Sequence, residues 1–450
     1  MSNRNFVLLI IVLVIVIMAV FGFLYLRKGT TPVDVISDGT NFLAQFNPFS
    51  SNPSTTPGDE TPGPDTNGDG IISEEELAVV KLKKVSSMPV AGFTSFLKER
   101  LKDVPIVPPP IPVEGEAPVK PKKVKPAPPA TEFALALRYV ERATGNIYQT
   151  FVDKIEERRF SETVIPKIYD AYFGNKGQSV VMRHLKSDEK TIETFAGALP
   201  KEKLGEDVVS YEIKGSFLVD GIQDLSLSPD TSKIFYLSNL GDSAIGTILN
   251  LSASLPAQAG KKTVAFNSVF TEWNAFWGTN KTITVTTKPS GNTLGHMYVI
   301  DTDKKNLVWM LGNINGLTTL MSPNGKSVLV GNNNLSLYVY NTDTKTYTEL
   351  GVRTLPEKCV WGKKSDFVYC AVPTFIEAGL YPDDWYRGEI SFSDQIWKIS
   401  ILNGSTDIIA DPFLQIGGEE IDGIKLALSE SEKYLFFVNK KDSFLWQLEL

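Results

Sequence analysis

Cysteine and histidine are scarce, because the 450 residues contain only Cys359, Cys370, His184 and His296 of these two types. Zinc sites are built from clusters of such residues, and these spacings form no ligand pair. Neither histidine has a Ser or Cys nucleophile in a recognisable elbow nearby, which argues against nucleophilic catalysis. Basic residues are not in excess either, since the formal net charge is −7. Nucleic-acid binding usually needs a basic face, so we expect no nucleic acid as a partner.

A long apolar run near the N-terminus is suited to crossing a membrane. It begins at Phe6, ends at Leu26 and contains no charged residue. A helix of this length spans the roughly 30 Å of a bilayer core. A cleavable signal peptide would have a shorter apolar core that ends in small residues, which this run lacks. We therefore expect residues 1–28 to be an uncleaved, single-pass membrane anchor.

The charges beside this run do not decide its orientation. Arg4 flanks one end, while Arg27 and Lys28 flank the other, so the positive-inside rule leans slightly towards a cytoplasmic location for the rest of the chain. The very short tail ahead of the run and the calcium loop described below favour the opposite. We expect the bulk of the chain on the extracytoplasmic side.

The two cysteines are compatible with that location. Cys359 and Cys370 flank the turn at 362–366 and could face each other across a hairpin. Adjacent strands are close enough for a disulfide, which would persist in an oxidising compartment. The alternative is two small buried residues on neighbouring strands.

Two segments have the composition of linkers. Residues 29–64 are rich in Thr, Ser, Asn, Pro, Asp and Gly and have no sustained apolar periodicity, which predicts a disordered polar stalk. Residues 103–130 are rich in proline and lysine, which predicts an extended, projecting insertion.

Residues 65–76 match the twelve-residue calcium loop of EF-hands at its diagnostic positions. The preceding residues 61–64 (Thr-Pro-Gly-Pro) cannot form the usual entering helix, so the alternative is an acidic turn that caps a helix. If Ca²⁺ binds, it would stiffen the junction that residues 65–77 make between stalk and main domain. Ca²⁺ prefers six to eight oxygen ligands, and these would come from Asp65, Asn67, Asp69, the Ile71 carbonyl, Ser73 and Glu76.

From residue 78 onwards the chain repeats one degenerate phrase. Each copy runs from an apolar strand through a polar corner into a second strand, then through a turn into a third. The clearest copy occupies residues 316–330 and continues at 335–340. Repetition of such phrases roughly every 40 to 55 residues is typical of β-propellers. Residues 78–450 are therefore predicted to form an all-β propeller.

The number of blades follows from the junctions between repeats. After Ile421 only three strands remain, at 423–428, 434–439 and 444–450. The fourth would come from residues 79–86, which would close the ring and remove an open sheet edge. A six-bladed ring with residues 79–86 outside it is the alternative. Seven junctions, which predict seven blades, resemble one another at 82–91, 159–166, 215–222, 264–270, 310–316, 350–356 and 416–421.

An insertion at residues 373–393 in the sixth blade has the densest set of possible ligand-binding side chains. Aromatic faces beside carboxylates suit a sugar or a peptide. An adjacent acid pair could also serve a glycosidase, although neighbours on one loop rarely point across one bond. Alternatively, the insertion folds over the ring and buries its own aromatics. The candidates are Tyr381, Asp383, Asp384, Trp385, Tyr386 and Arg387.

Several segments also resemble a known family, and they lie at 138–148, 314–320, 355–361, 369–373 and 381–399. They resemble uncharacterised, membrane-anchored WD40-like (PD40-type) β-propeller proteins of candidate-phyla bacteria. The resemblance covers residues 78–450, and it implies a propeller fold and an envelope location but no particular activity. We expect a non-catalytic module that binds a protein or glycan or acts as a scaffold. The alternative is a carbohydrate-active hydrolase or lyase that uses channel carboxylates such as Asp383 or Asp384.

Overall fold

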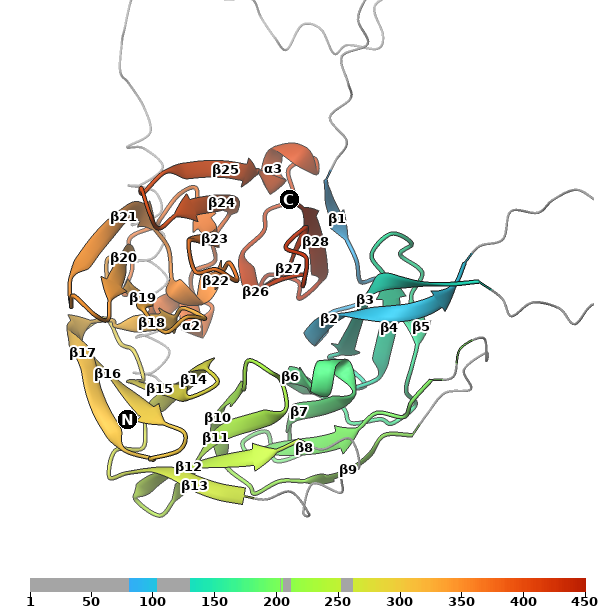
Figure 1. The fold of residues 1–450 in the computed structure, drawn as a ribbon, viewed down its shortest axis with the longest axis horizontal. Coiled ribbons are helices and arrows are strands. Elements are labelled where there is room, and N and C mark those ends of the chain that lie inside the picture. Colours follow the sequence, from blue (N-terminus) through green and yellow to red (C-terminus); the bar gives the residue numbers. More distant parts are fainter. Residues whose placement is uncertain (1–80, 103–129, 203, 205–211, 252–261) are drawn as a thin grey trace, which may run out of the picture. The chain divides into compact units, whose positions relative to one another are not determined.

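Seven four-stranded antiparallel sheets follow one another along the chain in the computed structural model (Figure 1). The structure describes residues 81–102, 130–202, 204, 212–251 and 262–450. We call the sheets blades 1 to 7 in chain order. The predicted all-β, seven-bladed propeller is confirmed, and the six-bladed alternative is wrong.

The first four blades each use four consecutive strands. Blade 1 contains β2 (Val90–Leu101), β3 (Thr131–Glu141), β4 (Ile147–Phe151) and β5 (Arg158–Arg159). Blade 2 contains β6 (Ile168–Gly174), β7 (Ser179–Leu185), β8 (Ile192–Ala198) and β9 (Lys214–Phe217). Blade 3 contains β10 (Ile222–Leu227), β11 (Lys233–Leu240), β12 (Ser243–Asn250) and β13 (Lys262–Ser268). Blade 4 contains β14 (Trp273–Thr279), β15 (Thr282–Thr287), β16 (Leu294–Asp301) and β17 (Leu307–Asn315).

The last three blades carry most of the helical turns within the part of the chain that the structure describes. Blade 5 contains β18 (Thr318–Met321), β19 (Ser327–Gly331), β20 (Ser336–Asn341) and β21 (Tyr347–Arg353). Blade 6 contains β22 (Cys359–Trp361), β23 (Phe367–Pro373), β24 (Asp394–Ser400) and β25 (Thr406–Ala410). Blade 7 contains β26 (Gly423–Leu428), β27 (Tyr434–Asn439), β28 (Leu445–Glu449) and β1 (Leu82–Lys84). Among the described residues, the short helices are η2 (Asn175–Gly177), η4 (Pro356–Lys358), α2 (Asp383–Arg387) and α3 (Pro412–Gln415).

The second strand of each blade contains a run of at least four buried residues because it is covered on both faces. In β27, every residue after Tyr434 is buried, and β19 is buried from Val328 onwards. Outer strands such as β21 and β25 instead expose most of their side chains. This gradient is expected where sheets stack face to face around an axis.

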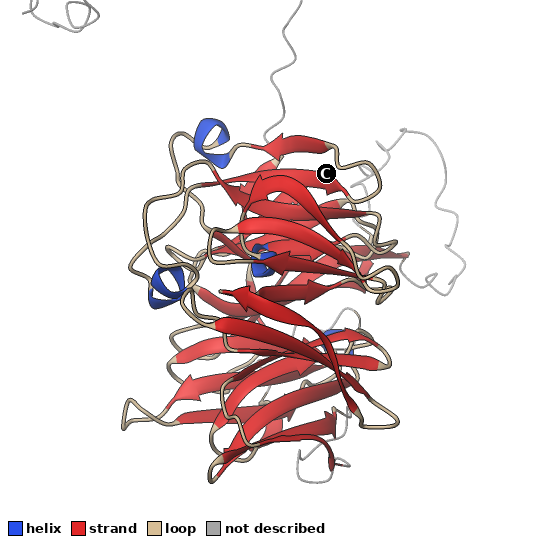
Figure 2. Ribbon diagram, turned by 90° about the vertical axis from the view of Figure 1, so that its left-hand side faces the viewer, coloured by secondary structure: helices blue, strands red, loops and turns tan. Residues whose placement is uncertain are grey.

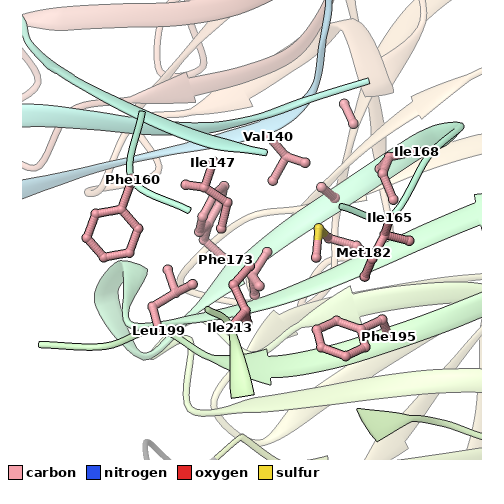
Figure 3. Close-up of a cluster of buried hydrophobic side chains, with 13 residues drawn as sticks. Val140, Ile147, Phe160, Ile165, Ile168, Phe173, Met182, Phe195, Leu199 and Ile213 are labelled. Carbon is pink, nitrogen blue, oxygen red and sulfur yellow. The ribbon is translucent and has the colours of Figure 1, made fainter. Parts of the chain in front are cut away.

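Seven hydrophobic clusters lie between successive blades, and the seventh joins blade 7 to blade 1. Figure 3 shows the cluster between blades 1 and 2, where Val140 and Ile147 pack against Phe173 and Met182. The inner strands approach closely here, because a Cβ on Gly92 would lie 1.9 Å from the carbonyl oxygen of Ala171. The seven clusters make the ring continuous.

The ring is closed by the predicted N-terminal strand. β1 pairs antiparallel with β28, with Leu82 opposite Leu448 and Lys84 opposite Trp446. Leu82 is only 2% exposed. The pairing joins the two ends of the propeller and covers the open edge of blade 7.

The ring has two opposite faces, which Figure 2 shows from the side. In antiparallel sheets of this order, the turns between second and third strands lie on the same face as the connections between blades. We call this the insertion face, because residues 374–393 join β23 to β24 on it. Lys81 lies at the opposite face, which carries the β26–β27 turn. Its carbonyl accepts a hydrogen bond from the backbone N–H of Glu449, and the next residue, Leu450, donates to the carbonyl of Lys433 in that turn.

Several predicted segments fall outside the described residues. These are the anchor at 1–28, the stalk at 29–64, the calcium loop at 65–77 and residues 103–129 of the Pro-rich insertion, which follows β2. Within the ranges that are described, no helix has the length and apolar character needed to cross a membrane.

Candidate functional site

The insertion at 374–393 reaches across several blades of the insertion face. Asp383 in α2 accepts a 2.7 Å hydrogen bond through Oδ2 from the backbone of Gly291, which belongs to the β15–β16 turn of blade 4. Lys440 in the β27–β28 turn of blade 7 donates to the carbonyl of Trp385. The insertion is thus held from both sides beside the centre of the ring (Figure 1).

Most of the predicted ligand-binding residues in this insertion make structural contacts. Tyr381 and Trp385 are 4% and 5% exposed and pack in a cluster with Phe392. Asp384 accepts from the backbone of Leu380 at 2.6 Å, and its other oxygen accepts from Arg387 at 2.5 Å. These contacts match the alternative in which the insertion buries its own aromatics. Ligand binding by these residues stays a prediction.

Tyr386 differs from Tyr381 and Trp385, because 41% of it is exposed. Its hydroxyl lies beside the carboxylate of Glu357 in η4, with Asp224 and Asp383 also near. Burial of the hydroxyl end and these negative charges raise the pKa of Tyr386 well above its usual value, so the phenol stays protonated. Tyr386 therefore presents a neutral hydroxyl donor next to acidic groups.

A cavity of about 250 Å³ lies at the inner strands of blades 3 to 5, next to η4. Its walls are mainly hydrogen-bonding groups, and they include Asp224, Asn274, Thr284, Thr286, Thr319 and Glu357. Thr286 and Thr319 share a 2.8 Å hydrogen bond between hydroxyls. We call this cavity together with Tyr386 the polar mouth. It has fixed donors and acceptors of the kind that orient a polar ligand.

The two carboxyls of the polar mouth have raised proton affinity. Burial raises the pKa of Glu357 to about 7 and that of Asp224 to about 6. Asp224 is held in place because its Oδ2 accepts from the backbone of Ala275 at 2.6 Å. Both groups can therefore gain or lose a proton close to neutral pH, so they can act as donors as well as acceptors.

A second charged group lies on the neighbouring inner strands. Lys425 in β26 contacts Asp170 in β6 and donates to the carbonyl of Ala91 at 2.6 Å. Arg183 lies 3.6 Å from Asp170 and donates to the carbonyl of Ile222 at 2.8 Å. Burial favours the neutral form of Asp170, but the positive charges outweigh burial and lower its pKa. The group links blades 7, 1, 2 and 3 at the centre of the ring.

A third charged group is completely buried between blades 6 and 7. Nζ of Lys358 lies 2.7 Å from Oδ2 of Asp394 and also contacts Asp422, and all three side chains are 0% exposed. Asp422 also accepts from the indole of Trp385 at 2.9 Å and from the backbone of Phe392 at 3.1 Å. These three charged side chains stabilise the base of the insertion.

The remaining predicted sites concern cysteine and calcium. Cys359 and Cys370 lie opposite each other in β22 and β23 and are joined by a disulfide. The calcium ligands Asp65 to Glu76 lie outside the described residues, so that site stays a prediction. In the ranges with described coordinates, no group of three or more His, Cys, Asp or Glu residues is arranged to hold a metal ion.

Sequence reasoning found Tyr386 but missed the rest of the polar mouth and the two groups around Lys425 and Lys358. It selected residues that are dense along the chain, whereas Asp224, Glu357 and Lys425 come from different blades. A usable signal was present. Charged residues such as Lys358 and Asp394 adjoin apolar runs that read as buried strands, and buried charges are rare unless they are paired.

Comparisons with known proteins give no family. No family model matches the chain, and no curated protein does, so the resemblance to PD40-type proteins stays a prediction. Among solved structures, an oligogalacturonate lyase in complex with manganese is similar with 9% identity and a TM-score of 0.44, covering 70% of this chain and 85% of the lyase. An oligogalacturonate lyase from Vibrio parahaemolyticus has 8% identity and a TM-score of 0.45, covering 70% of this chain and 86% of the lyase.

Proposed function

We propose that this protein is a non-catalytic binding module of the cell envelope, anchored by residues 6–26, with a polar mouth that binds a glycan. The polar mouth is the observation that supports this proposal. Threonine hydroxyls, the amide of Asn274 and the carboxyls of Asp224 and Glu357 line one cavity. Such a lining matches a ligand rich in hydroxyl groups.

The topology is compatible with an anchored module. Lys81, the first described residue, lies at the face opposite the insertion face. In this proposal, Ca²⁺ held by Asp65, Asn67, Asp69 and Glu76 stiffens the junction. Protease protection in intact cells tests the location: the ring should be digested from outside, and a ring accessible only after lysis would contradict it.

Glycan binding is tested with the full chain in detergent against fragments of envelope polysaccharide. Glu357→Ala removes one polar group of the mouth, while Asp407→Ala, on the exposed strand β25, is the matched control. We expect Glu357→Ala to weaken binding about tenfold or more, the equivalent of one good hydrogen bond, and Asp407→Ala to leave it unchanged. Equal affinities for the two variants, or no bound polysaccharide at all, would contradict the proposal.

A second candidate is a carbohydrate-active hydrolase or lyase. It is favoured by Glu357 and Asp224, because carboxyls with pKa values of about 7 and about 6 in one cavity suit general acid or base work near neutral pH. Incubating the bound polysaccharide with the protein distinguishes the two. New reducing ends or unsaturated uronates that disappear in Glu357→Gln would replace the binding proposal with this one.

The calcium loop is tested by calorimetry on the full chain. We expect Ca²⁺ to bind in the range of about 10⁻⁴ to 10⁻³ M that is typical of extracellular modules. Glu76→Gln should abolish the heat because it removes the bidentate ligand, whereas Asp59→Asn, just ahead of the loop, should not. Heat that persists in Glu76→Gln would place the ion elsewhere.

A further inference from the structure

The buried group Lys358, Asp394 and Asp422 has the geometry of a reaction centre. The amine of Lys358 and a carboxyl oxygen of Asp394 are 2.7 Å apart, and neither side chain is exposed to water. An amine held against a carboxyl group in a dry site can condense with it, because the fold supplies the orientation and excludes the water that would reverse the reaction.

We propose that Lys358 and Asp394 form an intramolecular isopeptide bond, with Asp422 as the carboxylate that carries the proton. The bond is an amide between Nζ of Lys358 and Cγ of Asp394. It would be a covalent modification made by the fold itself, and it is independent of the proposed glycan binding.

The reaction balances without a further reagent. A proton passes from the Lys358 ammonium to the carboxylate of Asp394 and ends on Oδ1, the oxygen without a hydrogen-bond partner among the described residues, which gives a neutral amine and a neutral acid. The amine attacks Cγ, a second proton passes from nitrogen to Asp422, and Asp422 returns it to the departing hydroxyl of Asp394. The C–N bond forms, the C–O bond breaks, and one water leaves. Nothing is oxidised or reduced.

The groups around Asp394 suit these roles. The backbone of Gly423 donates to Oδ2 of Asp394 at 2.7 Å, which is where negative charge develops during attack. The other oxygen, Oδ1, accepts no hydrogen bond from the residues that the structure describes, so it is free to leave. The rings of Trp385 and Phe392 lie 5.3 and 5.1 Å from Nζ of Lys358 and keep the site apolar.

The proton affinities of the two carboxyls support the same assignment. Burial raises the pKa of Asp394 to about 6, so its neutral acid form, the electrophile, is accessible near neutral pH. Burial also works against ionisation of Asp422, but Lys358 and hydrogen bonds from Phe392 and Trp385 outweigh it and lower its pKa. One carboxyl is thus suited to be attacked and the other to accept a proton.

The bond would remove a costly arrangement and fix a functional segment. Burying an ammonium with two carboxylates costs solvation energy that their attraction offsets only in part. An amide replaces two of these charges. Lys358 and Asp394 are 36 residues apart, and the loop between them contains α2 with Tyr386, so the bond would fasten one wall of the polar mouth.

Peptide mass spectrometry on the full chain tests the proposal directly. After reduction of the Cys359–Cys370 disulfide, trypsin should not cleave on the C-terminal side of Lys358. Trypsin recognises a positively charged side chain, and an acylated lysine carries no charge. We expect residues 354–363 joined to residues 388–398, at a mass one water below the sum of the two free peptides. Quantitative recovery of the separate peptides 354–358 and 388–398 would overturn the proposal, and a link to Asp422 would overturn the choice of partner.

Variants separate chemistry from folding. Lys358→Arg keeps a cation in the group and should give only linear peptides. Asp394→Asn should give the same linked peptide as the wild type, since ammonia leaves in place of water, whereas Asp394→Ala should give none. Asp422→Asn should leave at least tenfold more unlinked peptide than the wild type. A linked peptide in Asp394→Ala, or full linkage in Asp422→Asn, would contradict the mechanism.

Discussion

Two groups of lysine and aspartate occur in this ring in opposite surroundings. Lys358 with Asp394 and Asp422 is fully buried, whereas the side chains of Lys425 and Asp170 are 35% and 13% exposed. The groups are close along the chain, because Asp422 directly precedes β26 and Lys425 lies within it. Lysine and aspartate therefore have different surroundings at positions as close in sequence as Asp422 and Lys425.

Solvent access explains the difference. A partly wet ion pair gains little from its attraction, since water screens the charges and also solvates either partner alone. A dry pair is held together strongly, because a charge left without its partner would remain buried. The dry group, Lys358 with Asp394 and Asp422, can thus lock the insertion to blades 6 and 7. The wet group, Lys425 with Asp170, is held less tightly because Lys425 is partly exposed.

The largest expected effect comes from removing the two lysines in turn. Lys358→Met removes the cation and any bond to Asp394, and it leaves two carboxyls buried without a partner, so we expect a loss of at least about 3–5 kcal/mol in unfolding free energy. Lys425→Met should cost less, about 1 kcal/mol, because Lys425 is partly exposed and Arg183 still lies 3.6 Å from Asp170. Urea denaturation of both variants measures the difference. Equal losses would show that burial does not separate the two groups.

A smaller effect should follow from removing one neutral donor to the dry group. Trp385→Phe deletes the indole N–H that donates to Asp422 at 2.9 Å, and bonds to charged acceptors contribute about 1.5–3 kcal/mol. The matched control is Trp361→Phe, whose indole donates to the uncharged carbonyl of Leu320 at 3.1 Å and should cost less. A larger loss in Trp361→Phe by the same denaturation measurement would contradict the role of Asp422.

The ring could be predicted from the sequence, because the pattern of residues that specifies it is local and repeated. Apolar strands and polar turns alternate along residues 78–450, and each junction marks the passage from an outer strand to the next inner strand. Counting strands after Ile421 also located the missing fourth strand of blade 7. The β1–β28 pairing joins residues at opposite ends of the domain, yet the closed ring demands it.

The charged groups could not be predicted in the same way. Lys358 and Asp422 are 64 residues apart and meet only because blades 6 and 7 stack. Conversely, the segment from Tyr381 to Arg387 looked functional because its polar and aromatic residues are neighbours in sequence. In the fold, a short helix turns most of them towards the protein, and Tyr386 alone of its aromatic residues remains substantially exposed.

Glu357 is intermediate between the dry and wet groups in its access to water, and the pH dependence of stability should reveal this. Its pKa is about 7 in the fold against an ordinary value of 4.5. Below pH 4.5 the carboxyl is protonated in both states, so it contributes no difference. Between the two values the unfolded chain releases the proton while the fold retains it, so the wild type loses stability as pH rises.

Glu357→Gln should remove that loss. Relative to the wild type, its unfolding free energy should rise by about 1–2 kcal/mol between pH 4 and pH 8, after allowance for partial solvent screening. Denaturation curves at several pH values measure this difference. A constant difference across the range would mean that Glu357 titrates as it does in the unfolded chain.

The smallest expected effect concerns the hydroxyl of Tyr386 in the polar mouth. Its hydrogen bond favours the charged form of Glu357 and so holds the pKa of that carboxyl below what burial alone would give. Tyr386→Phe should therefore move the Glu357 transition to higher pH, while changing stability at pH 5 by about 0.5 kcal/mol or less. The same pH series on Tyr386→Phe and on the double variant with Glu357→Gln separates the two effects, because the shift should vanish when Glu357 is absent. A transition that moves to lower pH would mean that Tyr386 hydrogen-bonds to the protonated carboxyl of Glu357. The polar mouth would then resemble the dry group, rather than the wet group, in how strongly it excludes water.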